Sequence, residues 1–129
     1  GNILKARVLL VELLDRYDEE RDPDLEPNAY PFNYVLKCAG NCVGSTEEKL
    51  KAFQAAAQTY NDLRQRENIS ADSYTYAFWF KCCNNLLPIG EIRRKGLLLA
   101  FEECKSQGLV SDEALRRLIA GTPTEIVRP

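Results

Sequence analysis

The stretch that decides the fold is Ala29-Tyr-Pro-Phe-Asn-Tyr-Val-Leu-Lys-Cys-Ala-Gly-Asn41, which recurs as Ser73-Tyr-Thr-Tyr-Ala-Phe-Trp-Phe-Lys-Cys-Cys-Asn-Asn85. The offset between the two copies is 44 residues (74 − 30). The identical pairs are Tyr30/Tyr74, Lys37/Lys81, Cys38/Cys82 and Asn41/Asn85, and the aromatic pairs are Phe32/Tyr76 and Tyr34/Phe78. A segment that returns at such a period is typical of stacked helical repeats.

The sequence around these two copies also has helical periodicity. Apolar residues recur at spacings of three and four, as expected for one face of a helix. The three stripes are Leu10, Leu13, Leu14 and Tyr17; Leu50, Phe53, Ala57 and Tyr60; and Leu97, Phe101 and Cys104. Ser45-Thr46-Glu47-Glu48 is a helix-start signal, and the prolines of the loop over 22–28 cannot continue a helix.

These signals predict an all-α protein, an α-solenoid of stacked antiparallel helical hairpins. The predicted helices are 3–20, the pairs 29–42/46–67 and 73–86/89–107, and a short helix over 112–120. The corresponding division is a helical-repeat domain over 1–120, with a half repeat 1–28, repeats 29–72 and 73–112, the start of a further helix over 112–120, and an irregular tail over 121–129. We assign Phe32, Tyr76, Trp79 and Phe80 to the core between hairpins.

Composition excludes several classes of protein. The 129 residues are 45% hydrophobic and 28% charged, as in ordinary globular domains. The apolar run Val8–Val11 is far too short to span a bilayer, so we expect no membrane segment. The chain has no Met and is helical from Ile3, which suggests a fragment of a longer protein whose targeting segment is missing. The net charge of −2 runs against the basic footprint that nucleic-acid binding usually leaves.

The residue types needed for most catalysis and metal binding are scarce. The chain contains no His, which is the commonest general base, and no glycine-rich phosphate loop, so we expect no enzyme. Its five cysteines include no Cys-x-x-Cys pair, so we expect reduced, packed thiols and neither a metal nor a cofactor.

Two stretches resemble the pentatricopeptide repeat family. Glu26-Pro-Asn-Ala-Tyr-Pro-Phe-Asn-Tyr-Val-Leu36 resembles the family junction Lys-Pro-Asp-Val-Val-Thr-Tyr-Asn-Thr-Leu-Ile. Phe101-Glu-Glu-Cys-Lys-Ser-Gln-Gly-Leu-Val-Ser-Asp112 resembles Phe-Glu-Glu-Met-Lys-Glu-Lys-Gly-Ile-Lys-Pro-Asp. The resemblance covers residues 1 to about 120. The repeats are longer than usual for the family, with insertions at 41–47 and 86–91.

The resemblance implies roles for individual residues. In the family, the residue after the early aromatic and the last residue of the repeat together read one RNA base. Here these pairs are Asn33 with Asp72, which would favour uracil, and Ala77 with Asp112, which would read weakly. Asn28, the last residue of the half repeat, also holds a base-reading position. Tyr30 and Tyr74 hold the base-stacking position; the alternative is that both pack between hairpins.

A polar stripe accompanies these positions. Asn33, Lys37 and Asn41 share one helical face, as do Ala77, Lys81 and Asn85, so the two lysines and asparagines would lie along an RNA groove near phosphates. The alternative is an ordinary solvated face, which is also how we interpret Arg93-Arg94-Lys95 and Arg116-Arg117. Arg64 and Arg66 are expected to be balanced by Asp62 and Glu67.

The functional hypothesis is therefore a single-stranded RNA-binding module, a fragment of a larger pentatricopeptide protein acting in RNA processing, stability or translation in a mitochondrion or plastid. Its target would include uracil. The alternative is a protein–protein interaction scaffold or a subunit of an organellar assembly, which the net charge and Ala77 favour. Exposed end repeats would also allow self-association.

Overall fold

A computed structural model describes residues 2–20 and 28–119. Six helices occupy these ranges: α1 Asn2–Glu20, α2 Ala29–Gly40, α3 Thr46–Gln65, α4 Ser73–Leu86, α5 Glu91–Ser106 and α6 Asp112–Ile119. They lie within about two residues of the predicted ranges, and the all-α class is confirmed. Most of the loop predicted over 22–28 and the whole tail predicted over 121–129 lie outside the described residues. Among the helices so described, none is both long and apolar enough to cross a bilayer.

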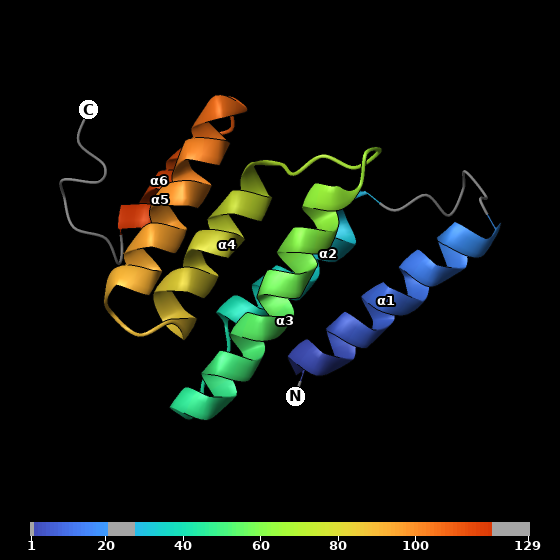
Figure 1. Ribbon diagram of the computed structural model, residues 1–129, viewed down its shortest axis with the longest axis horizontal. Helices are drawn as coiled ribbons and strands as arrows, with labels where there is room; N and C mark the ends of the chain where they lie inside the picture. Colours follow the sequence, from blue (N-terminus) through green and yellow to red (C-terminus); the bar gives the residue numbers. More distant parts are fainter. Residues whose placement is uncertain (1, 21–27, 120–129) are drawn as a thin grey trace.

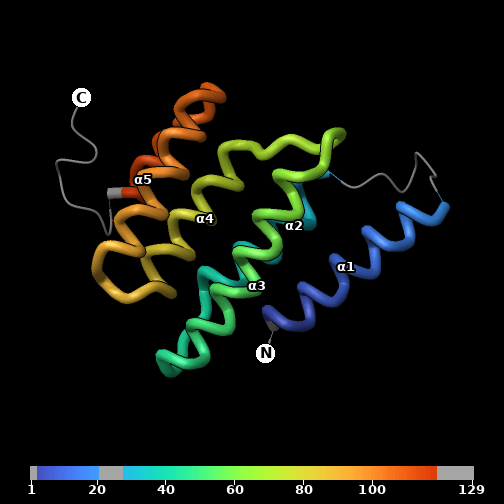
Figure 2. Tube along the Cα trace, viewed as in Figure 1, coloured from blue at the N-terminus to red at the C-terminus, as the bar shows by residue number. Residues whose placement is uncertain are grey.

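The helices stack side by side from α1 at one end to α5 and α6 at the other (Figure 1). α2 packs on α4 and α4 packs on α6, so these three helices form one row. α3 packs on both α2 and α4, whereas α5 packs on α4. The trace in Figure 2 shows α3 and α5 drawn over this row, and α1 contacts α2 and α3 at the end of the stack.

Local signals fix where the helices begin and end. Ser45 and Glu48 form a reciprocal capping box at the start of α3, as the sequence predicted. The side chain of Asn28 caps α2 by accepting from the backbone N–H of Tyr30 at 2.9 Å. After α5, Gly108 adopts a positive φ of 69°, a conformation that favours glycine and ends the helix.

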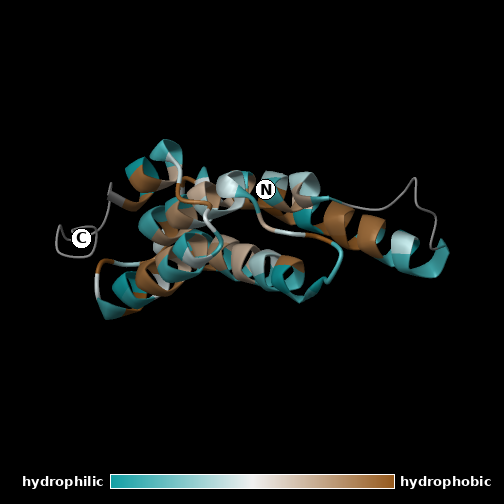
Figure 3. Ribbon diagram, turned by 90° about the horizontal axis from the view of Figure 1, so that it is seen from above, coloured by the Kyte–Doolittle hydropathy of each residue, from teal (hydrophilic) through white to brown (hydrophobic). Residues whose placement is uncertain are grey.

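The core lies between the rows of helices. Phe32, Tyr76 and Phe80 are fully buried and Trp79 nearly so, which confirms the core assignment of all four. Trp79 stacks on Tyr60 of α3 at 4.4 Å between ring centroids. Figure 3 shows hydrophobic residues concentrated where the helices face one another. A second cluster, around Ala6, Leu10 and Leu14, joins α1 to α2 and to the end of α3.

The stripe predicted for α3 is partly wrong. Leu50 is 41% exposed, and the buried face is rotated toward Ala52, Ala55, Ala56, Thr59, Tyr60 and Leu63. Small alanines let α3 approach α2 and α4 closely, and apolar periodicity underweights alanine. The buried hydroxyl of Thr59 donates to the Ala55 carbonyl at 2.8 Å, so its burial leaves no unsatisfied donor.

Ion pairs connect helices that are distant in sequence. Arg66 pairs with Asp18 of α1 at 2.9 Å, and Arg64 pairs with Glu103 of α5 at 3.0 Å. Both arginines are thus balanced and structural, as expected, but their partners are not the neighbouring Asp62 and Glu67; Asp62 pairs instead with Arg7 at 2.7 Å. Each pair contributes about 0–1 kcal/mol at such exposure, and together they fix the position of α3 between its neighbours.

Candidate nucleic-acid interface

α2 and α4 lie parallel and in register, which brings the two repeat copies together. The Asn33 side chain meets Asp72 and Thr75 near the start of α4, and the Cys82 thiol donates to the Leu36 carbonyl at 3.2 Å. Near the helix ends, the Asn85 amide donates to the Gly40 carbonyl at 2.8 Å. The early residues of one copy therefore contact the early residues of the other, and the late residues contact the late ones, so the two copies run side by side in the same direction.

Aromatic side chains project from the exposed side of this helix pair. Tyr30 is 74% exposed and Tyr74 is 63% exposed, so the alternative in which both pack between hairpins is wrong. Tyr34, one turn after Tyr30, is also exposed, and Phe78, one turn after Tyr74, is half-buried. Tyr74 and Phe78 lie nearly parallel, with ring centroids 6.5 Å apart. Together, Tyr30, Tyr34, Tyr74 and Phe78 form what we call the aromatic face.

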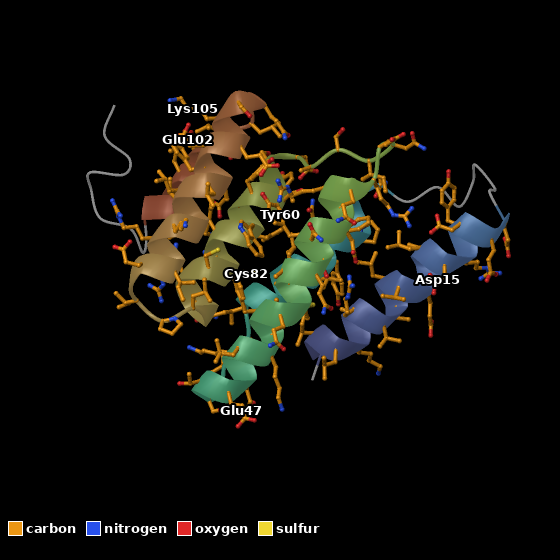
Figure 4. All side chains as sticks on the ribbon, in the orientation of Figure 1. Asp15, Glu47, Tyr60, Cys82, Glu102 and Lys105 are labelled. Atoms are coloured by element: carbon orange, nitrogen blue, oxygen red, sulfur yellow. The ribbon has the colours of Figure 1, made fainter. Side chains whose placement is uncertain are left out.

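The same helices carry positive charge and no acidic residue of their own. Between residues 29 and 44, and again between 73 and 90, the sequence contains no Asp or Glu. Lys37 is exposed on α2, and Lys81 occupies the matching position on α4. Figure 4 labels Asp15, Glu47 and Glu102, which lie on α1, α3 and α5. Within the described helices, the acidic residues lie on α1, α3, α5 and α6, while Asp72 caps the start of α4 and Glu67 lies in the loop before it.

Asn33 and Asp72 come together, but inside the protein. Asn33 is only 7% exposed, and its Nδ2 donates to Asp72 Oδ1 at 3.0 Å. Its Oδ1 accepts from the Thr75 hydroxyl at 2.7 Å. Asp72 caps α4 in a capping box with Thr75, accepting from its backbone N–H at 3.0 Å. These contacts join α2 to α4, and we call the three residues the Asn33 network.

The second predicted base-reading pair has a different geometry. Ala77 is buried in the core, so its methyl group faces protein rather than the surface. Asp112 is the exposed first residue of α6, and the preceding Ser111 caps that helix by accepting from the Ala114 N–H at 3.1 Å. By capping position, the counterpart of Asp72 and Asn28 is therefore Ser111, one residue before the predicted one.

The predicted polar stripe ends in a shallow cleft of about 400 Å³. Asn41, Lys81, Asn85 and Arg117 line it together with Gly40 and Asn84. Lys81 donates to the Asn41 side chain, and Asn85 donates to the Gly40 and Cys42 carbonyls at 2.8 and 3.0 Å. Asn85 thus holds the end of α4 against the end of α2, whereas Lys81 and Arg117 supply the cationic side chains of the cleft. Lys37 is placed outside this cleft.

A second cleft opens on the other side of the molecule. It has a volume of about 660 Å³ and lies between α3 and α5, with Trp79 of α4 also contributing. The Tyr60 hydroxyl donates to Glu103 at 3.3 Å there, and Arg64 lies over the Tyr60 ring. Burial raises the pKa of Tyr60 above its ordinary value of 10.0, with the Glu103 carboxylate adding to the rise. The hydroxyl therefore stays protonated at neutral pH.

The three buried cysteines contribute no candidate reactive group. Cys82, Cys83 and Cys104 are buried, and burial raises the pKa of Cys83 to about 12 and that of Cys104 to about 11. A protonated thiol is a poor nucleophile and a poor metal ligand. Cys38 and Cys42 are half-buried and also free. Over the described part of the chain, no cluster of three or more potential metal ligands occurs.

Three participants were not predicted from the sequence. Tyr34 and Phe78 extend the aromatic face, and the signal for them was their spacing of four residues after the two predicted tyrosines. Thr75 completes the Asn33 network; the signal was its place three residues after an acidic helix cap.

No family model, curated protein or solved structure matches the chain.

Proposed function

We propose that this chain is a single-stranded RNA-binding module of the pentatricopeptide type, an α-solenoid segment that binds RNA across the exposed side of α2 and α4. The observation that carries the proposal is the aromatic face beside Lys37 and Lys81 on two adjacent helices without acidic residues. Following the resemblance, we place its role in RNA processing, stability or translation in a mitochondrion or plastid.

The chemistry of this surface suits single strands. Exposed tyrosine rings stack on unpaired bases, which a duplex would keep within its own stack. Lysines near the rings attract the phosphate backbone. With one tyrosine position in each of two repeats, about two bases would stack on the described surface, so this segment alone should bind weakly.

Binding of fluorescently labelled 12-nucleotide RNA, followed by anisotropy over a salt series, tests the proposal. We expect affinity to fall as salt rises, since log K depends on log salt with a slope of about −0.7 per phosphate neutralised. Lys37→Glu/Lys81→Glu should weaken binding strongly. The matched control is Lys95→Glu/Lys105→Glu, which makes the same charge change at exposed positions of α5 and should change binding far less.

The alternative is a protein-interaction scaffold, and one observation favours it. Leu4, Val8 and Leu9 of α1 are exposed, and α1 lies at one end of the stack (Figure 1). Exposed apolar groups of this kind are common at protein interfaces. If RNA fails to bind even at high protein concentration, or if both double variants bind equally, the RNA proposal is wrong and the scaffold becomes the better explanation.

A further inference from the structure

The aromatic face binds RNA with little selectivity between bases, we infer, because the groups that would read base edges are already used inside the protein. This inference rests on the proposed function and specifies its ligand as single-stranded RNA of any sequence. It runs against the uracil preference that Asn33 with Asp72 would imply.

The side-chain amide of Asn33 is already hydrogen-bonded within the protein. An asparagine side chain has two N–H donors and an oxygen with two acceptor positions. One donor goes to Asp72 and the oxygen accepts from Thr75, with 93% of the residue's surface removed from solvent (7% exposed). A base edge could reach this amide only by separating α2 from α4, because both partners belong to the start of α4. Asn33 therefore acts between helices.

One carboxylate oxygen of Asp72 is also used within the protein. Its Oδ1 accepts from the Asn33 amide, from the Thr75 backbone N–H at 3.0 Å and from the Thr75 hydroxyl at 3.1 Å. Asn33 keeps a second N–H, but that residue is buried, so the pair can offer a ligand only the other carboxylate oxygen, Oδ2 of the half-buried Asp72. A carboxylate oxygen only accepts, and all four bases present N–H donors on their edges. One acceptor of this kind distinguishes poorly between bases.

At the corresponding positions of the second repeat, the two residues are Ala77 and Ser111. Ala77 is 2% exposed and offers neither a polar group nor surface at the position equivalent to Asn33. The cap of α6, Ser111, uses its hydroxyl oxygen to accept from the Ala114 N–H. Neither repeat thus presents a free donor–acceptor pair to a base, whereas both present an exposed tyrosine. Every base has an aromatic face, so stacking accepts them all.

The test compares 12-nucleotide oligo-U, oligo-A and oligo-C RNA at one moderate salt concentration. We expect the three dissociation constants to agree within about tenfold, with differences that follow stacking strength. Tyr30→Ala and Tyr74→Ala should each weaken all three by about 5- to 150-fold, the equivalent of losing one stacked base. Asp72→Asn keeps a good helix cap and should leave the ratios between the three unchanged.

A preference for oligo-U above about tenfold that Asp72→Asn moves to another base would overturn the inference while leaving the proposed function intact. Binding that ignores both tyrosine substitutions would overturn the stacking surface. Failure to bind any of the three RNAs would refute the proposed function and the inference together. Asn33→Ala adds an independent reading, because selectivity lost in that variant while its helical circular dichroism is retained would also contradict us.

Discussion

Replacing Asn33 by alanine should cost the protein stability rather than a base contact. The side chain bridges α2 and α4 through two hydrogen bonds, to Asp72 at 3.0 Å and from Thr75 at 2.7 Å. Those partners are 39 and 42 residues away in sequence, so the substitution removes two long-range bonds at once. Asp72 and Thr75 keep their contacts with each other, so neither is left fully without a partner.

The size of the effect follows from the charge on each partner. A neutral hydrogen bond contributes about 0.5–1.5 kcal/mol net, and one to a charged group contributes about 1.5–3 kcal/mol. The carboxylate of Asp72 places the first bond in the charged class, and the Thr75 hydroxyl places the second in the neutral class. We therefore expect Asn33→Ala to lower the free energy of unfolding by about 2–4 kcal/mol, which is a large share of the about 5–15 kcal/mol of a typical domain.

Urea unfolding followed by circular dichroism measures this loss. Asn61→Ala is the matched control, because Asn61 lies exposed on α3 and should change stability by less than about 0.5 kcal/mol. A double-mutant cycle with Thr75→Val should show a coupling of about 0.5–3 kcal/mol between the two sites. A loss for Asn33→Ala no greater than that of Asn61→Ala, or additive effects in the cycle, would show that the network does not join the helices.

Three further outcomes follow from burial. Phe80→Ala should lower the free energy of unfolding in urea by about 3–5 kcal/mol because the ring is fully buried, whereas Phe78→Ala, at a half-buried ring of the aromatic face, should lower it by less than half as much. Equal losses would contradict the assignment of Phe80 to the core and Phe78 to the surface. The contribution of Tyr60 to stability should be fully present below pH 10 and fall above it, because the unfolded chain loses this proton first. The buried thiols act in the same way from their ordinary pKa of 9.0 upward, so the measurement is the difference between the wild type and Tyr60→Phe, whose decline should be shallower by up to about 1.4 kcal/mol per pH unit. An unchanged slope would count against the raised pKa of Tyr60. Ellman's reagent should modify two thiols rapidly in the native protein and the three buried thiols only on unfolding. The rapid reaction should be absent from Cys38→Ala/Cys42→Ala, and rapid reaction of all five thiols would refute the burial.

The helices could be predicted because their signals are local. Periodicity, the Ser45–Glu48 capping box and the repeated aromatic order each act over a few residues of chain, and the resulting helix ranges agree with the structure. The core aromatics were predictable for the same reason, since Phe32 and Phe80 lie on strongly apolar faces. The α3 face was harder, because alanines such as Ala56 give a weak apolar signal even when fully buried.

The site was only partly predictable because its bonds join distant parts of the chain. The spacing of Asn33 relative to Tyr30 cannot show that Asn33 points into the helix contact and Tyr30 away from it. The direction depends on where α4 packs, and the deciding partner is 39 residues away. The one-residue shift from Asp112 to Ser111 has a similar origin, since the sequence offers two adjacent polar residues and only the helix start selects between them.

The arrangement of charge reconciles the proposed RNA surface with a net charge of −2. Packed helices lie about 8–10 Å apart, and charges separated by more than about 8–10 Å are largely screened at physiological salt. Phosphates over α2 and α4 would therefore interact mainly with Lys37 and Lys81 and, at the start of α4, with Asp72, while carboxylates one helix away, such as Glu47, are screened. At low salt that screening is lost and repulsion from the acidic helices grows. The rise in affinity on lowering salt should accordingly be shallower than two lysines alone would give, and Glu47→Gln should steepen it.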